Sequence, residues 1–184
     1  MGEIKNSIII FAFFTLLLGL VYPLVITGIS QLAFPEQANA NLIEINGTVV
    51  GSTLIGQEFT SPQYFHGRPS AIDYNSSSSS GSNLGPTNQK LIDNVNHNME
   101  NIRAENSLQS NEDIPADLVE TSASGLEGYI YVDSAMLQVH RIAHARNISE
   151  SEVIKIIEDN KEFTFVTGNP IVNVLKLNIA LDKL

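Results

Sequence analysis

The strongest feature of the hydropathy pattern is a long apolar run near the N-terminus, from Asn6 to Phe34. No charged residue lies between Lys5 and Glu36. A membrane-spanning helix needs about 20 mostly apolar residues to cross about 30 Å of hydrocarbon. Because the run is apolar on every side, it differs from the amphipathic helix of a soluble protein. We therefore expect residues 1–36 to be a single transmembrane anchor in the lipid bilayer.

A cleaved signal peptide is the main alternative for this run. Ala38-Asn39-Ala40 has the A-x-A form of a cleavage site. The apolar region of a signal peptide covers only about 7–15 residues, and this run is much longer. The length favours an anchor that stays on the chain.

Several residues interrupt the lipid-like character of the anchor. Pro23 removes one backbone hydrogen bond, which membrane helices tolerate when a neighbour satisfies the freed carbonyl. Tyr22, Gly28 and Gln31 could also face a protein rather than lipid. We predict that these four residues contact a partner in the membrane.

The charges that flank the run predict its orientation. Lys5 precedes it, whereas only acidic residues follow it until the first cation, Arg68. Basic residues stay on the cytoplasmic side, so the N-terminus is expected inside the cell. Residues 37–184 should then form one extracytoplasmic domain at the cell membrane.

The pattern after the anchor mixes both kinds of secondary structure and predicts one small α+β domain. Asn46-Gly47 between β-forming residues indicates a hairpin, because both central residues of a type I′ turn need a positive φ. We expect strands at 42–45, 48–50, 163–166 and 171–174 and helices at 87–106, 114–119, 133–146, from Ser149 onward, and 175–184.

Spacing and capping residues give details of the helices. The first long helix has an apolar stripe, made of Leu91, Val95, Met99 and Ile102. We expect Asp133 or Ser134 to cap the next helix, and Met136, Val139 and Ala143 to form its inner face. Ser149 and Glu152 have the spacing of a capping box, with Val153, Ile156 and Ile157 directed inward.

The segment 59–75 is irregular and rich in aromatic residues, proline and glycine. It is either a packed surface loop or a contact surface, since aromatic residues and arginine dominate interface hot spots. In the second interpretation the contact residues are Tyr64, Phe65, Arg68 and Tyr74.

A serine run at 76–80 and a segment rich in glycine and asparagine at 81–88 follow. The backbone N–H groups of such a segment could form a nest that accepts an anion. The segment does not match a phosphate-binding loop, because no Lys-Ser or Lys-Thr pair follows the glycines. The pattern favours a structural loop that leads into a helix.

Composition and charge exclude several classes of function. The formal net charge is -10, with 20 acidic and 10 basic residues, which argues against binding to nucleic acid. The chain has 0 cysteines, so disulfides, thiol catalysis and cysteine zinc sites are excluded. His140 and His144 stand four residues apart without an evident third ligand, so we expect surface histidines and no metal.

We find no constellation of catalytic residues in the sequence. No G-x-S-x-G motif is present, and nothing fixes the separation of Asp117 from Glu127 as a carboxylate pair. One anchor and one acidic domain without catalytic residues predict an accessory subunit rather than an enzyme.

Ordered blocks through nearly the whole chain resemble the KdpC family, the C subunits of the Kdp potassium-transporting P-type ATPase. They include Tyr22-Pro23-Leu24, Gly67-Arg68-Pro69-Ser70-Ala71, Ser80-Gly81-Ser82-Asn83-Leu84-Gly85-Pro86-Thr87-Asn88, Pro115-Ala116-Asp117-Leu118-Val119 and Val172-Asn173-Val174-Leu175, with Gln138, Arg141 and Asn178. One departure is Glu127-Gly128-Tyr129-Ile130-Tyr131, where the family usually reads D-P-H-I-S. No role of that family histidine transfers to this chain.

The resemblance implies an accessory, non-catalytic subunit of an ATP-driven potassium uptake pump. Its partners would be a channel-like A subunit that holds the ions, a B subunit that hydrolyses ATP, and a small F subunit. The chain would stabilise this assembly and need no cofactor of its own, because the complex handles ATP and potassium. The alternative function is a membrane-tethered binding or sensor module that is unrelated to a pump.

The resemblance also implies that the chain promotes ATP binding by the B subunit, through a loop likened to a nucleotide-binding signature. The residues of this loop are Ser80, Gly81, Ser82, Asn83 and Gly85, with Gln89. ATP is cytoplasmic, however, and the charge rule places the loop outside the cell. We therefore expect no contact between this loop and nucleotide.

Overall fold

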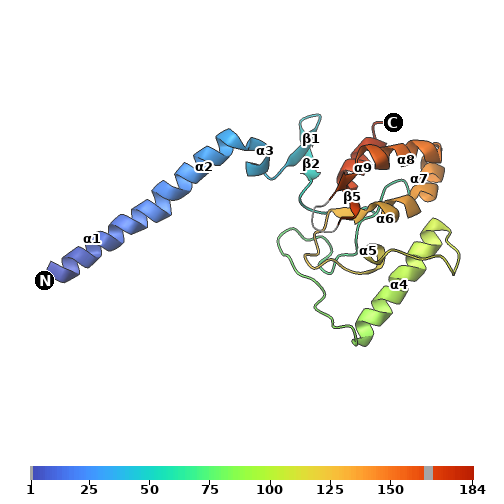
Figure 1. The fold of residues 1–184 in the computed structure, drawn as a ribbon, viewed down its shortest axis with the longest axis horizontal. Coiled ribbons are helices and arrows are strands. Elements are labelled where there is room, and N and C mark those ends of the chain that lie inside the picture. Colours follow the sequence, from blue (N-terminus) through green and yellow to red (C-terminus); the bar gives the residue numbers. More distant parts are fainter. Residues whose placement is uncertain (1, 164–167) are drawn as a thin grey trace. The chain divides into compact units, whose positions relative to one another are not determined.

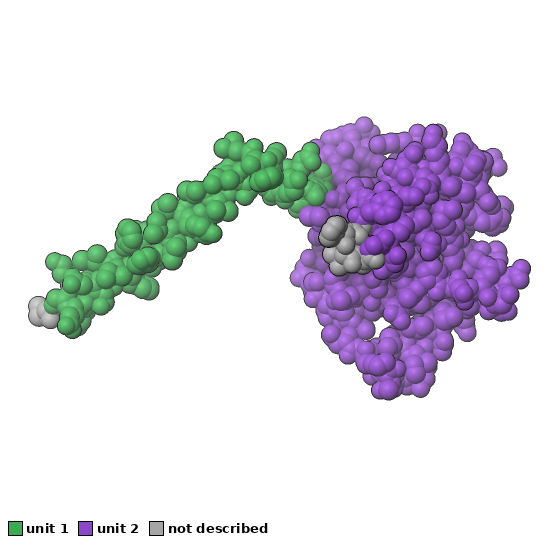
Figure 2. Space-filling model, viewed as in Figure 1, with its two compact units in different colours: residues 1–42 green, residues 43–184 purple. Residues whose placement is uncertain are grey.

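The computed structural model describes residues 2–163 and 168–184, which form two compact units, residues 1–42 and 43–184 (Figure 2). The first unit is helical, with α1 (Gly2–Leu16), a π-helical turn (Leu17–Val21), α2 (Tyr22–Ala33) and α3 (Pro35–Ala38) (Figure 1). The continuous helix Gly2–Ala33 has 32 residues, none of them buried, and is long and apolar enough to cross a membrane. These features fit the predicted anchor.

The first β-structure in the chain is a two-stranded hairpin, with β1 (Leu42–Ile45) paired to β2 (Thr48–Ser52). Its turn residues Asn46 and Gly47 have φ values of 53° and 75°. Both values are positive, as a type I′ turn requires, so the predicted hairpin is confirmed.

A three-stranded antiparallel sheet lies at the centre of the domain, in the order β3 (Tyr129–Tyr131), β5 (Pro170–Asn173), β4 (Glu162–Phe163). Ile130 pairs with Val172 in this sheet. Strand β3 was not predicted, because three residues after a glycine are too few to show alternation. Val174 begins a helix instead of ending the strand, and the strand residues predicted at 164–166 lie outside the described residues.

Four helices, α6 (Val132–Leu137), α7 (Val139–Arg146), α8 (Glu150–Asp159) and α9 (Val174–Leu181), form the core together with this sheet (Figure 1). The capping box of Ser149 and Glu152 is confirmed. The inner face of α8 is confirmed too, since Val153, Ile156 and Ile157 are all buried.

The single helix predicted at 133–146 is wrong, since the chain turns at Gln138 and forms α6 and α7 instead. The turn changes which side faces inward, so Val139 and Ala143 are buried whereas Met136 is 38% exposed. The predicted cap is also wrong, because α6 begins after Tyr131.

Helix α4 (Gln89–Asn106) and the short α5 (Ala116–Val119) complete the domain, and both were predicted within the usual uncertainty of helix ends. Asn88 caps α4 by accepting a hydrogen bond from the backbone N–H of Lys90. The apolar stripe of α4 packs against α5 but is only half-buried. This helix therefore extends the edge of the core rather than forming its centre (Figure 1).

Candidate functional site

The most distinctive part of the domain is an irregular segment, residues 53–75, which we call the inner loop. It contains neither helix nor strand. Its main-chain groups therefore need other partners, because unpaired buried backbone groups are costly. Polar side chains from the helices supply these partners.

Arg141 on α7 provides two of these hydrogen bonds. The residue is only 8% exposed, and its guanidinium donates to the carbonyls of Pro62 and Tyr64 over 2.6 and 3.0 Å. It also donates to Asn106 Oδ1 at 3.0 Å and to Gln138 Oε1 at 2.7 Å. One buried cation thus joins the inner loop to α4 and α7.

Two buried amides bind the next two residues of the inner loop. Asn178 on α9 accepts from the N–H of Phe65 at 2.8 Å and donates to its carbonyl at 3.0 Å. Gln138 makes the same pair of bonds with His66, at 2.8 and 3.1 Å. Each amide therefore replaces a neighbouring strand for one residue of the loop.

The aromatic side chains of the inner loop serve the fold. Phe65 is 0% exposed and lies in the core, so it offers no surface to a partner here. Tyr64 donates to Asp182 Oδ2 at 3.0 Å, and the guanidinium of Arg146 lies 4.9 Å from its ring centre. For these two residues the structure agrees with a packed loop.

Arg68 and Tyr74 lie at the opposite end of the inner loop. Arg68 donates to the Glu120 carbonyl at 3.3 Å, while its buried Nε has no partner among the described residues. The Tyr74 hydroxyl donates to the Arg68 carbonyl. Burial and the charge of Glu58 raise the pKa of Tyr74 to about 12, so this hydroxyl remains a donor.

A cavity of about 290 Å³ separates the inner loop from α4. Its charged lining includes Glu58, Arg68, Asp73 and Glu105. His66 also lines it and lies 3.3 Å from Glu105. Burial and the nearby charge of Arg141 lower the pKa of His66, so its imidazole is neutral at pH 7. The cavity is therefore acidic overall and unsuited to a polyanion.

The proposed nucleotide loop lies elsewhere, in residues 76–88, which we call the serine loop. Its attachment is to a neighbouring backbone: Ser80 N–H donates to the Ser124 carbonyl at 3.0 Å, and Gly81 lies against Ala123. Asn83 is exposed, and Gln89 in the first turn of α4 donates to Asp93 at 2.8 Å. The amide of Ser80 is thus already used within the chain.

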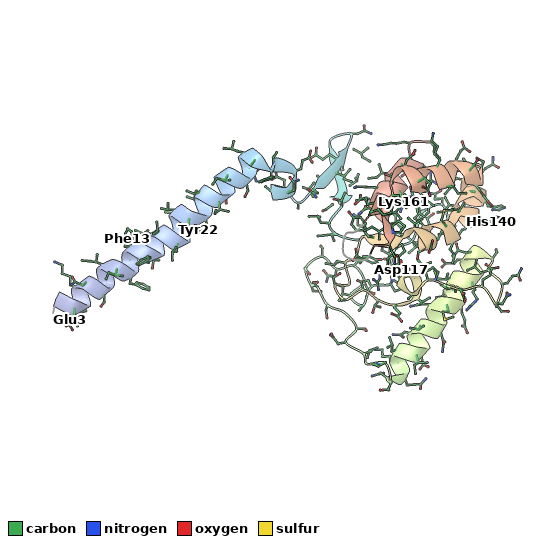
Figure 3. The ribbon with its side chains drawn as sticks, in the orientation of Figure 1. Glu3, Phe13, Tyr22, Asp117, His140 and Lys161 are labelled. Carbon is green, nitrogen blue, oxygen red and sulfur yellow. The ribbon has the colours of Figure 1, made fainter. Side chains whose placement is uncertain are left out.

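The four predicted contact residues of the anchor are all exposed on the helix. Tyr22 is 59% exposed, and Gly28 has open space where a Cβ would lie (Figure 3). Pro23 occupies the first turn of α2, directly after the π-helical turn. Gln31 exchanges hydrogen bonds of 3.3 and 3.2 Å with Asn39, so its amide has a partner just after the anchor in the chain.

Asp117, one of the two carboxylates considered as a pair, makes hydrogen bonds within the fold. Asp117, buried near α6 (Figure 3), accepts hydrogen bonds from the Tyr131 N–H and the Ser134 hydroxyl. This bond explains why Ser134 does not cap α6. Across the described residues, no group of three or more histidine and acidic side chains could hold a metal ion.

Sequence reasoning missed the polar side chains that hold the inner loop. The available signal was a polar residue within an apolar helical face: Gln138 precedes Val139, and Asn178 lies between Leu177 and Leu181. Such residues are conspicuous because buried polar groups need hydrogen-bond partners.

An apolar helix of spanning length and one small α+β domain define the class, a membrane-anchored protein with a single spanning helix. A family model described as "KdpC: K+-transporting ATPase, c chain" matches residues 4–183, so the chain belongs to the KdpC family. It is therefore a component of a potassium-transporting ATPase.

Two curated relatives agree with this assignment, and both are named as potassium-transporting ATPase KdpC subunits. The protein from Rhodopseudomonas palustris is 44% identical over 196 residues, covering 98% of this chain and 97% of the relative. The protein from Mycobacterium bovis is 48% identical over 175 residues, covering 93% of each.

Proposed function

We propose that this chain is a non-catalytic assembly subunit, which stabilises the complex of the A, B and F subunits through its anchor and its domain. The observation that carries this proposal is the inner loop, whose irregular backbone is fixed by Arg141, Gln138 and Asn178. A fixed irregular surface can bind a partner without an ordering cost. An assembly subunit needs this property more than it needs reactive groups.

The test of this proposal is purification of the complex in mild detergent through a tag on this chain. We expect the large A and B subunits to copurify, with potassium-dependent ATPase activity. Removal of this chain should lower the yield of the A–B complex. An A–B complex that keeps its yield and activity without this chain would contradict the assembly role.

We further propose that the N-terminus is cytoplasmic and the domain lies outside the cell. Lys5 before the anchor and the acidic residues after it support this orientation. The chain has no native cysteine, so Gly2→Cys and Ser78→Cys give unique labelling sites. An impermeant thiol reagent on intact cells should label Ser78→Cys alone, and labelling of Gly2→Cys alone would reverse the topology.

With this orientation, the serine loop has no role in ATP binding. The engaged amide of Ser80 and the absence of a Lys-Ser or Lys-Thr pair support this view. Equilibrium binding of ATP to the full chain should give no saturable signal at micromolar concentrations. Saturable binding that is lost in Ser80→Ala would instead favour the nucleotide role.

For the domain, we propose that Arg68 is the central contact with the pump, with Tyr74 positioning its main chain. The Arg68 side chain lines the 290 Å³ cavity and a second one of about 190 Å³, and its Nε lacks a partner among the described residues. Arg68→Ala should weaken the complex by about 1–3 kcal/mol, as a hot spot would.

Arg103 is the matched control for Arg68. It also makes one bond of 3.3 Å to a carbonyl, that of Glu112, and its Nε likewise has no partner among the described residues. Arg103→Ala should leave the complex unchanged. Equal effects of both substitutions on complex stability, or a lower melting temperature of Arg68→Ala alone, would make Arg68 a structural residue.

A further inference from the structure

The π-helical turn and Pro23 together remove both the i+4 and the i+5 helical donors of one carbonyl, that of Leu18. Within an α-helix, the Leu18 carbonyl would accept from the N–H of Tyr22, but this N–H donates to Leu17 instead. In a π-helix the donor would be residue 23, which is a proline and has no N–H. Among the described residues, no side chain donates to Leu18 either.

The position of this carbonyl makes its lack of a donor important. The uncharged run extends from Asn6 to Pro35, and Leu18 lies near its midpoint. Lipid tails offer no hydrogen-bond donor, and water is scarce at that depth. Because an unsatisfied carbonyl in hydrocarbon is costly, a donor from a neighbouring membrane helix would stabilise this position.

The surroundings of Leu18 leave room for such a donor. Gly19, the next residue, has no heavy atom within 4 Å of the place where a Cβ would lie. The hydroxyl of Thr15, three residues before Leu18, is already used, because it donates to the Phe11 carbonyl at 2.8 Å. The chain's own side chains therefore do not fill this position.

We propose that the Leu18 carbonyl accepts a hydrogen bond from a hydroxyl or amide side chain on a transmembrane helix of the pump. This inference rests on the proposed function of the anchor as an interface, and it adds the site and the chemistry of the contact. Pro23 creates the acceptor by removing a donor, and the partner helix supplies the replacement. The π-helical turn would thus bind a partner helix through a hydrogen-bond acceptor, so the partner must supply a donor.

Selective isotope labelling can observe this carbonyl directly. Leucine labelled with ¹³C at the carbonyl and ¹⁵N-glycine give a signal only at Leu–Gly pairs, which in this chain are Leu18-Gly19 and Leu84-Gly85. Gly85→Ala removes the second pair, and nothing lies within 4 Å of that position. Solid-state NMR of the chain in lipid bilayers then reports on Leu18 alone.

We expect the Leu18 carbonyl shift to move into the hydrogen-bonded range when the chain is assembled with the pump's membrane subunits. Pro23→Ala, which restores the missing N–H, should give a bonded shift in the isolated chain and lower copurification about threefold, the ratio expected from an average interhelical hydrogen bond. Val25→Ala is the control, since it changes size on the same helix without changing a donor.

An identical Leu18 shift in the isolated and assembled chain would overturn the inference. A bonded shift in the isolated wild-type chain, with cross-linking between copies, would overturn it in favour of self-association. Loss of the proposed function has a different signature, because the wild-type chain would then not copurify with the membrane subunits at all.

Discussion

The domain contains two adjacent irregular segments that are held in opposite ways. The inner loop, residues 53–75, exchanges hydrogen bonds with buried side chains on α7, α9 and β5. The serine loop, residues 76–88, is exposed over most of its length and is attached mainly through Ser79 and Ser80, which both donate to the Ser124 carbonyl. Both segments lack regular structure, yet only one is fixed by the core.

This difference shows that irregular structure and flexibility are separate properties. The main-chain groups of the inner loop form hydrogen bonds with side chains that are buried in the core. These bonds fix the backbone of the loop, as hydrogen bonds to a neighbouring strand fix a β-strand. The serine loop has few buried contacts, which is typical of segments with low local stability. A partner that needs a fixed surface is therefore better served by the inner loop.

Removal of the Arg141 guanidinium should have the largest effect on how the inner loop is held. Arg141→Met keeps much of the volume but leaves the carbonyls of Pro62 and Tyr64 without their donor. Each buried acceptor that loses its partner costs about 1–3 kcal/mol. We expect the free energy of unfolding to fall by about 3–5 kcal/mol.

Thermal unfolding of the full chain in detergent measures this effect. The chain has 5 tyrosines and 0 tryptophans, so near-ultraviolet circular dichroism reports mainly on the domain. Because about 1 kcal/mol shifts the melting temperature of a chain of this size by about 2–4 °C, the drop should exceed about 6 °C. Lys155→Ala, on the exposed side of α8, should not shift it, and an Arg141→Met variant as stable as wild type would contradict the prediction.

A smaller effect should follow from Asn178→Leu, which removes both hydrogen bonds to Phe65. Leucine has the same branched shape and the same number of side-chain heavy atoms, so the loss comes from one unpaired N–H and one unpaired carbonyl rather than from a cavity. We expect a destabilisation of about 2–4 kcal/mol in urea unfolding. The same exchange at Asn94, exposed on α4, is the control, and equal midpoints for both variants would show that the amide does not hold the loop.

The two loops also mark the limit of what the sequence could predict. Local patterns gave the anchor, the Asn46-Gly47 turn and the Ser149 capping box, because each depends on residues close together in the chain. The hydrogen bond of Gln138 to His66 joins residues 72 apart. No local pattern contains such a pairing, so the two loops looked equally irregular.

The same reason explains the outcome for the candidate contact residues. Aromatic residues and arginine suit both an interface and a core, and only the three-dimensional packing separates Phe65, which is buried, from Arg68, which is half-buried. The split between α6 and α7 was missed because Gln138 is a normal helix residue by propensity. Its role at the turn depends on distant partners.

The pH dependence of the unfolding free energy is a further test of the inner loop, because this loop contains the titratable side chain of His66. Its folded pKa lies below the ordinary value of about 6.5, owing to burial and then to the charge of Arg141. As the pH falls through about 6.5, the unfolded chain binds a proton before the folded chain does. Stability is therefore lost on acidification, by at most about 1.4 kcal/mol per pH unit for this one group.

His66→Gln isolates this contribution from those of the carboxylates. Glutamine keeps a donor for the Ser61 carbonyl, which His66 now contacts at 3.0 Å, but it does not titrate. The plot of unfolding free energy against pH between about 7 and 5 should be shallower for the variant than for wild type. Parallel plots for His66→Gln and wild type would contradict the assignment.

The smallest change in stability is expected from an insertion in the serine loop, which has few buried contacts. A Gly-Ser insertion between Ser77 and Ser78 lengthens the exposed part of the serine loop, ahead of the attachment at Ser79 and Ser80. The entropic cost of closing a longer loop grows only with the logarithm of its length, so the change should stay below about 1 kcal/mol. The same insertion between Ser61 and Pro62 is the matched test, because it displaces the carbonyls that Arg141 binds. That variant should melt well below wild type, whereas the serine-loop variant should melt within a few degrees of it and still copurify with the pump. If both insertions were tolerated equally, the inner loop would not be fixed by the core, and the observation that carries the proposed assembly role would be lost.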